Sequence, residues 1–263
     1  MSANGNDKVM LQAPFVHYQV SYGDRSSTMG DFSTENLTFG RTSIGRVTLG
    51  SDHNNEGLFV GTAGLLGLGY TDISFPSQVV RIFGRRFSYC LSDSQAGSTS
   101  SSSTLIFGDA VLPVGINMGG RSRQVNVAMS EFQISGNGNG GVIVNSGTSV
   151  TRLVQPAYIT MRDTFWARMT QVNHTTAGFS LFNTCYDLSG KDVVKVPTGV
   201  FHFGRGSNLS IPPRNYLILV NTTGLFCFAF AGTSSGLTII GDIQQQVIRV
   251  VFDPVTSRVR FVS

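Results

Sequence analysis

Short stretches in which apolar and polar residues alternate run through most of the chain. Residues 15–24 (FVHYQVSYGD) and 30–40 (GDFSTENLTFG) alternate around a turn rich in Gly, Asp and Ser. This pattern is typical of a β-hairpin. Residues 247–263 (VIRVVFDPVTSRVRFVS) predict a second hairpin, whose turn begins at Asp253-Pro254.

Two segments carry helical signals instead. In residues 74–84 (SFPSQVVRIFG), Ser74 is a candidate N-cap, a proline occupies the first turn, and Gly84 ends the helix. Residues 155–171 (QPAYITMRDTFWARMTQ) predict a second helix opened by Pro156. Its apolar face consists of Tyr158, Met161, Phe165 and Met169.

An apolar run that ends in glycine occurs twice, at residues 63–69 (AGLLGLG) and 237–242 (LTIIGD). Each copy follows an earlier β segment. The repetition favours two similar β lobes.

Composition supports a turn-rich β protein and narrows the range of partners. The chain has 263 residues with 31 Gly, 19 Phe and only 13% charged residues, which excludes a coiled coil or a disordered chain. The net charge is +4 and the basic residues are scattered, so we expect no nucleic-acid partner. The apolar runs are too short to span a bilayer, so we expect no membrane partner.

Two motifs of well-known chemistry occur in the wrong structural context. Residues 136–141 (GNGNGG) fit the dinucleotide-binding pattern, but a strand follows them where a helix is needed. Residues 232–236 (GTSSG) fit the nucleophile-elbow pattern with Ser234 as nucleophile, but the flanking strands predict a hairpin turn. The four histidines are dispersed in sequence. We therefore predict no cofactor and no metal.

The signals for cellular compartment conflict. Residues 1–11 contain no apolar signal-peptide core. Four N-glycosylation sequons, at Asn36, Asn173, Asn208 and Asn221, point to a secreted glycoprotein. Sequons also arise by chance in a Ser/Thr-rich chain. Three cysteines leave one unpaired if a disulfide forms, so the compartment stays open.

The stretch 142–150 (VIVNSGTSV) brings these observations together. In the order of the chain it stands with YGDRSSTMGDFSTENLTF (22–39), LGSDHNNEGLFVGTAGLLGLG (49–69), LFNTCYDLSG (181–190), FCFAFAG (226–232) and IIGDIQQQVIRVVFD (239–253). Together these segments resemble the pepsin-type aspartic proteases, specifically the plant nepenthesin-like branch. The resemblance covers nearly the whole chain.

The resemblance implies an all-β fold with two pepsin-like lobes and a few short helices. We expect an incomplete N-terminal lobe at residues 1–124 and a C-terminal lobe at residues 125–263. Each lobe of such a protease supplies one Asp from an Asp-Thr/Ser-Gly turn. The two close carboxylates share one proton, so one member acts as base and the other as acid.

The sequence departs from this pattern at the catalytic positions. The second-lobe motif reads Asn145-Ser146-Gly147-Thr148, with Asn where the family has Asp, and no Asp-Thr-Gly or Asp-Ser-Gly precedes Tyr22. Thr148 corresponds to the hydroxyl that orients the carboxylate, or it is only a turn hydroxyl. The flap that closes over substrate corresponds to Tyr22, Gly23 and Asp24, although Tyr22 is also compatible with an ordinary strand position.

The resemblance also bears on the cysteines and the compartment. It implies a disulfide between Cys185 and Cys227, with Cys90 left free. Family members are secreted or enter the endomembrane system.

Three functions remain open at this point. The leading hypothesis is a catalytically inactive family member that binds a peptide or protein or has lost its function. A second is an active aspartic endopeptidase of which this sequence is a fragment or isoform. A third is a non-catalytic inhibitor of the xylanase-inhibitor type, although three cysteines argue against it. The sequence does not indicate the oligomeric state.

Overall fold

The computed structural model describes residues 10–12, 15–23, 25–57, 63–95, 102–108, 132–136, 139–170, 172, 174–175, 178–203 and 207–262. The fold is mainly β, with short helices, as predicted. The chain forms two compact units. Unit 1 comprises Met1–Tyr89, Leu105–Leu112 and Val251–Arg260, and unit 2 comprises Cys90–Thr104, Pro113–Val250 and Phe261–Ser263. The predicted domain boundary at 124/125 lies outside the described residues and stays a prediction.

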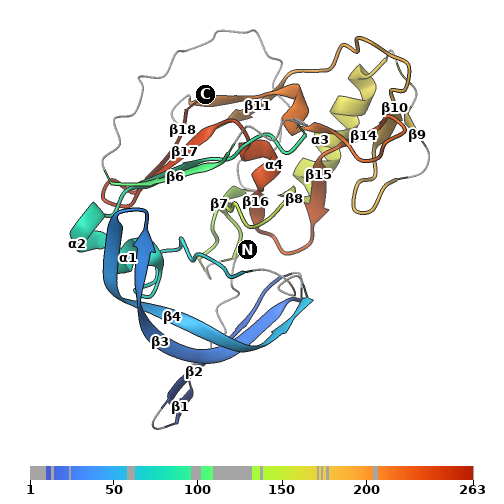
Figure 1. Cartoon of the computed structure of the whole chain (residues 1–263). Helices are drawn as coiled ribbons and strands as arrows, with labels where there is room; N and C mark the ends of the chain where they lie inside the picture. Colours follow the sequence, from blue (N-terminus) through green and yellow to red (C-terminus); the bar gives the residue numbers. More distant parts are fainter. Residues whose placement is uncertain are drawn as a thin grey trace. The chain divides into compact units, whose positions relative to one another are not determined.

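Unit 1 contains an antiparallel sheet in the order β1-β2-β3-β4. Its strands are β1 (Met10–Gln12), β2 (Phe15–Ser21), β3 (Ser27–Phe39) and β4 (Thr42–Glu56). β3 and β4 form a long curved ribbon (Figure 1). The predicted hairpin is confirmed, because β2 and β3 pair from His17↔Asp31 to Ser21↔Ser27.

The helix predicted at residues 74–84 is broken into two turns, which corrects that prediction. α1 (Phe75–Gln78) and α2 (Val80–Phe83) are separated at Val79. Gly84 ends α2 with φ 75°, as expected for a glycine C-cap. Ser74 precedes α1, but its hydroxyl bonds the Ser77 hydroxyl (3.0 Å) and makes no capping bond to the helix backbone.

A small apolar core forms where these helical turns meet the long ribbon. Its buried members are Ile44, Val47, Phe75 and Val79, with Leu37, Leu49, Phe83 and Phe107 packed against them. A second sheet, in the order β18-β17-β5-β6, lies mostly in unit 1. Its strands are β5 (Phe87–Cys90), β6 (Thr104–Phe107), β17 (Arg249–Asp253) and β18 (Arg258–Val262), and the last two form the second predicted hairpin.

The described residues of unit 2 form three sheets. The first, in the order β13-β14-β10-β9, comprises β9 (His174–Thr175), β10 (Cys185–Asp187), β13 (Leu217–Leu219) and β14 (Leu225–Phe228). The second pairs β11 (Gly199–His202) with β12 (Asn208–Ile211). A 3₁₀ turn, η4 (Pro213–Asn215), leads from β12 into β13.

The third sheet of unit 2, in the order β15-β8-β16-β7, corrects a prediction. Its strands are β7 (Val142–Val144), β8 (Thr151–Val154), β15 (Phe230–Thr233) and β16 (Thr238–Ile240). The strands on either side of residues 232–236 do not form a hairpin, because β8 lies between them. Each instead runs parallel to a strand from earlier in the chain, β15 to β8 and β16 to β7. Short-range alternation cannot reveal such long-range pairing.

The predicted 155–171 helix is present as α3 (Gln155–Arg168), with proline in its first turn. Tyr158, Phe165 and Met169 are buried, and Met161 packs against them. Their partners are both aliphatic and aromatic, and Phe165 contacts the rings of Tyr186, Tyr216 and Phe228. The Phe165 ring stacks on Phe228 with centroids 4.4 Å apart. This cluster is the larger part of the core of unit 2.

The predicted disulfide is present. Cys185 on β10 and Cys227 on β14 are directly opposite in the antiparallel register, with Cα atoms 4.0 Å apart. Both are fully buried beside Val150, Phe182 and Ile218. Cys90 is free.

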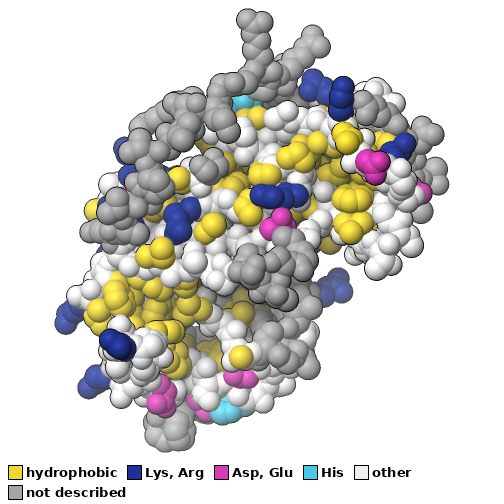
Figure 2. Space-filling view, turned by 45° about the horizontal axis from the view of Figure 1, so that its top comes forward, with side chains coloured by type: hydrophobic (Ala, Val, Ile, Leu, Met, Phe, Trp, Pro, Cys, Tyr) yellow, Lys and Arg dark blue, Asp and Glu magenta, His cyan; other side chains and the backbone are white. Residues whose placement is uncertain are grey.

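Basic side chains and apolar helices are the surface features that concern nucleic-acid and membrane partners. On the face shown in Figure 2, Lys and Arg side chains lie singly or in small groups among hydrophobic and neutral ones. The described helices include none that is both long and apolar enough to cross a membrane.

Candidate functional site

The Asn145 turn follows directly after β7. The Asn145 N–H donates to the Ile240 carbonyl (3.0 Å), which continues the pairing of β7 with β16. The side-chain Oδ1 of Asn145 accepts the Gly147 N–H (2.9 Å), and the Thr148 N–H points back to the Asn145 carbonyl (3.4 Å). Of the predicted site residues, the structure therefore places Asn145, Ser146, Gly147 and Thr148 in one turn, which is closed by the Asn145 side chain.

The helix α4 (Asp242–Gln245) supports this turn from behind. The Asp242 N–H donates to the Thr148 carbonyl (2.7 Å) and the Ile243 N–H to the Ser149 carbonyl (3.1 Å). These bonds satisfy helix N-terminal donors that lack a partner within the helix. Close packing also explains Gly241, because a Cβ there would lie 2.5 Å from the Val150 carbonyl carbon.

Sequence reasoning missed the three glutamines that follow Asp242. Gln244 is 1% exposed and bonds three backbone groups: it accepts the Thr151 N–H (3.0 Å) and donates to the Asn215 and Ala229 carbonyls (both 2.8 Å). Gln245 donates to the Ile240 and Gly241 carbonyls. The usable signal was three consecutive amides between two apolar strands. Buried amides must be hydrogen-bonded, and each can donate and accept at once.

One carboxyl group next to the turn, that of Asp242, has a strongly shifted pKa. Burial raises the pKa of Asp242 to about 6, so this group is largely protonated in mild acid. Asn145 carries an amide, which does not ionise in the working range of such enzymes. The turn itself can therefore bind through hydrogen bonds, but it contains no side chain that ionises as an acid or base in this range.

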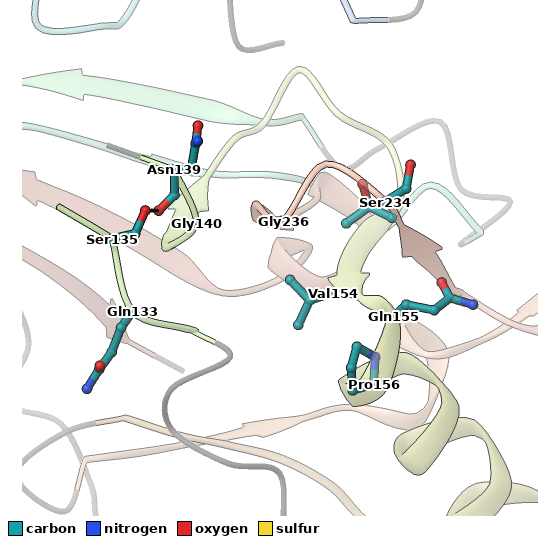
Figure 3. Close-up of a pocket in the computed structure, with 10 residues that line it drawn as sticks. Gln133, Ser135, Asn139, Gly140, Val154, Gln155, Pro156, Ser234 and Gly236 are labelled. Carbon is teal, nitrogen blue, oxygen red and sulfur yellow. Dashed lines mark hydrogen bonds between the residues drawn. The ribbon is translucent and has the colours of Figure 1, made fainter. Parts of the chain in front are cut away.

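An open pocket of about 430 Å³ lies at the start of α3. It is lined by Gln133, Ser135, Asn139, Gly140, Val154, Gln155, Pro156, Thr233, Ser234 and Gly236. Figure 3 shows Ser135 and Asn139 on one side, joined by a 2.7 Å hydrogen bond from the Ser135 hydroxyl to the Asn139 carbonyl, and Gln155 and Ser234 on the other. Several of the lining side chains are polar, but more of the lining surface is apolar than polar, and none of the predicted site residues is in it.

Residues from both glycine-rich motifs, 136–141 and 232–236, line the pocket, and the sheet topology explains why they lie together. Residues 136–141 lead into β7, residues 232–236 lead into β16, and these two strands start side by side in parallel. Ser234 is exposed at the tip of its loop and no strand–turn–helix elbow surrounds it. Within the described ranges, no group of three or more His, Cys, Asp or Glu side chains is arranged to hold a metal ion.

The predicted flap residues lie at the end of the β2–β3 hairpin in unit 1. The Tyr22 N–H donates to the Ser26 carbonyl (2.8 Å) and the Arg25 N–H to the Tyr22 carbonyl (3.0 Å). Gly23 is exposed in this turn, and Asp24 lies outside the described residues. The flap role of these residues stays a prediction.

The sequons differ in their surroundings. Asn36 and Asn208 are exposed, whereas the Asn221 side chain is half-buried and accepts the Thr223 and Leu225 N–H groups. Asn173 lies outside the described residues. Their use for glycosylation stays open.

Two protein-family models match the chain. Residues 4–109 match the model described as "Xylanase inhibitor N-terminal", and residues 112–263 match "Xylanase inhibitor C-terminal". The second match alone includes the Asn145 turn, α4 and most of unit 2.

Curated relatives are aspartic proteases of plants. The chain is 52% identical to "Aspartyl protease family protein 2" of Arabidopsis thaliana, over 93% of this chain and 54% of that protein. It is 36% identical to "Aspartic proteinase nepenthesin-1" of Nepenthes gracilis, over 95% of this chain and 61% of that protein. The chain thus spans little more than half the length of these relatives.

Solved structures give the same fold. The basic 7S globulin from soybean superposes with a TM-score of 0.69 at 19% identity, over 96% of this chain and 74% of that one. Conglutin gamma from lupine seeds gives 0.66 at 20% identity, over 94% and 72%. The matched models, the identity to plant aspartic proteases and the pepsin-like fold lead to one conclusion: the chain belongs to the plant nepenthesin-like branch of the pepsin-type aspartic protease family.

Proposed function

We propose that this chain is a non-catalytic member of its family, which binds peptide or protein segments without hydrolysing them. The observation that carries the proposal is the amide at Asn145, in the turn where the family places a carboxylate. Oδ1 of this amide accepts the Gly147 N–H, so the turn keeps a regular closed shape. A binding site with intact shape but without acid–base chemistry is the expected result.

The chemistry explains the expected loss of activity. Peptide hydrolysis by this family needs one carboxylate that accepts a proton from water and a second, protonated one that polarises the carbonyl. A single positioned acid–base group contributes about 10²–10⁴ in rate. Asn145 can donate a hydrogen bond to a peptide carbonyl through its Nδ2, but it cannot accept a proton from water. Asp242 is one carboxyl group, and a dyad needs two.

Two other functions have specific support. An active endopeptidase that includes this chain as a part is supported by the names of the curated relatives, which are nearly twice as long. An inhibitor of glycan-degrading enzymes is supported by the names of the matching family models. The small number of cysteines argues against the inhibitor.

The test is cleavage of a denatured protein substrate between about pH 3 and 5, where a shared-proton dyad is half-protonated. It compares the wild type, Asn145→Asp and the matched control Asn139→Asp, each with and without a statine-type aspartic protease inhibitor. We expect no inhibitor-sensitive turnover from any of the three, because Asn145→Asp restores only one carboxylate. Binding of the same inhibitor, measured by calorimetry, reports a cleft that still accepts peptide.

Two outcomes would contradict the proposal. Inhibitor-sensitive turnover by wild-type protein, in which mass spectrometry detects no deamidation at Asn145, would establish the endopeptidase. Stoichiometric inhibition of a xylanase, without binding of the peptide-like inhibitor, would establish the third function.

A further inference from the structure

Three titratable side chains from adjacent strands meet on the first sheet of unit 1. His17 on β2 and Asp31 on β3 are directly opposite in the register, and the His17 Nδ1 contacts the Asp31 Oδ1. From β4, the His53 Nε2 lies 2.7 Å from Asp31 Oδ2. Each oxygen of one carboxylate therefore has its own imidazole. The sequence alone placed these histidines apart.

A β-bulge directs His53 to this carboxylate. Met29 pairs with Asn54 and Gly30 pairs with Asp52, so His53 has no cross-strand partner of its own. Such an extra residue redirects its side chain. Gly30 permits the bulge, since a Cβ there would lie 2.0 Å from the Ser51 carbonyl oxygen.

The two rings and partial burial set the pKa of Asp31. The hydrogen bond from His53 lowers the pKa of Asp31, partial burial opposes it, and the hydrogen bond and charge of His17 lower the pKa further. Another carboxylate on the same sheet, Asp52 on β4 opposite Gly30, accepts a hydrogen bond from Asn55. Glu35 lies farther along β3, and the ionisable groups that shift the pKa of Asp31 are the two histidines. The Asp31 side chain is 24% exposed, against 43% for His17 and 61% for His53.

We propose that His17, Asp31 and His53 form an acid-strengthened clamp that ties β2, β3 and β4 together below the turn that carries Tyr22. Both charges exist together only when the carboxylate has lost its proton and the imidazoles have gained theirs. Carboxylates and imidazoles in general are both charged in mild acid, so the clamp is strongest there. The pKa of Asp31 is lowered, so its charge is lost only as the pH falls below the usual range of an aspartate carboxyl. Where imidazoles lose their protons, toward neutral pH and above, only the hydrogen bonds remain.

The consequence is a hairpin that stiffens in mild acid. The pair His17–Asp31 is five residues from Tyr22 along β2, so it restrains the strand that leads into the turn. This inference does not depend on the proposed function, because it concerns backbone opening and not turnover.

Hydrogen exchange measures the clamp directly. Protection factors of the amides in β2, β3 and β4 are compared at about pH 5 and about pH 7.5, after correction for intrinsic exchange. Because partly exposed ion pairs are weak, we expect protection about two- to fivefold higher at the lower pH. Asp31→Asn should reduce this ratio to one. His202→Gln is the control, because its ring bonds the neutral Asn208 side chain (2.6 Å) on another sheet, and it should leave the ratio unchanged.

A second pair of variants keeps the inference testable if Asp31→Asn does not fold. His17→Gln and His53→Gln each remove one of the two ion pairs. Each should therefore bring the ratio of protection at about pH 5 to that at about pH 7.5 closer to one. A wild-type ratio of one, or a ratio that persists in Asp31→Asn or in both histidine variants, would overturn the proposal.

Discussion

Two regions of the molecule have the same order of features and very different structures. Residues 63–83 and 237–246 each contain an apolar run that ends in glycine, and each continues into a short helix. In the second region, residues 238–240 form β16, and Ile240 is 5% exposed. In the first, residues 63–68 form no regular secondary structure, and Leu66 is 46% exposed.

The difference comes from the neighbours that each run has. β16 lies between β7 and β8, and Ile239 pairs with Ile143 on one side and Arg152 on the other. For the first run, the backbone bonds in the described part include one from the Phe75 N–H to the Gly67 carbonyl (2.9 Å). An apolar run becomes a strand only where partner strands satisfy its backbone groups, and propensity is secondary to that context.

Each of the two short helices is joined to a strand by a glutamine side chain, but the two glutamines differ in burial. Gln78 of α1 accepts the Thr48 N–H (2.7 Å) and donates to the Thr48 carbonyl (3.0 Å). Gln244 of α4 makes the same kind of bonds to Thr151 and two carbonyls. Each glutamine fastens a short helix to a strand, one half-exposed and the other fully buried.

The largest difference in the free energy of unfolding should appear between substitutions in the two apolar runs. Ile240→Ala removes buried side-chain volume and should lower the free energy of unfolding by about 2–5 kcal/mol. Leu66→Ala removes an exposed side chain and should change it by less than about 0.5 kcal/mol. Urea denaturation of both variants measures the difference. Equal losses would show that residues 63–69 are packed in solution.

The glutamine pair should give the next effect. Gln244→Leu leaves three buried backbone groups without their partner and should cost about 3 kcal/mol. Gln78→Leu removes bonds that water can replace at a half-exposed site, so about 1 kcal/mol is expected. The same denaturation experiment applies. A larger loss at Gln78 would reverse the ranking that burial predicts.

These contrasts show how far the sequence could predict the fold. Local signals predicted the β2–β3 and β17–β18 hairpins and α3, because alternation and helical spacing act over a few residues. The family resemblance predicted the disulfide and the Asn145 turn. The pairing of β15 with β8 and of β16 with β7 could not be read from either strand, because parallel partners lie far apart in sequence.

The site, like the fold, was predictable only where the signal is local in sequence. Asn145 was identified by its motif, but its support from α4 depends on bonds between residues about 94 positions apart, such as Asp242 to Thr148. Gln244 has no motif of its own. Its importance appears only when its amide is seen buried among backbone groups.

Asp242 should make the stability of the second region depend on pH. The Asp242 pKa is raised from 3.8 to about 6 by burial, so the folded state holds a proton that the unfolded state releases. Stability therefore falls as pH rises from about 4 to about 6. Because the carboxyl is partly exposed, we expect only about 1 kcal/mol from this group.

The check is the pH dependence of urea unfolding in Asp242→Asn and in Asp72→Asn, an exposed acid of the first region. The difference between wild type and Asp242→Asn should grow over that pH range, with the variant more stable at the upper end. A constant difference would show that Asp242 ionises freely in the folded state.

The smallest effect is expected at the start of α1. A Ser N-cap usually contributes about 1 kcal/mol through its bond to a helix N–H. The Ser74 hydroxyl instead bonds the Ser77 hydroxyl (3.0 Å), so Ser74→Ala should cost only about 0.5 kcal/mol. Ser77→Ala removes the same bond and should cost a similar amount, and the double variant should cost little more than either single one. A loss well above 1 kcal/mol for Ser74→Ala, with strict additivity in the double variant, would mean that Ser74 caps α1 in solution. The first region would then satisfy a helix N-terminal donor, as α4 does through the carbonyls of Thr148 and Ser149.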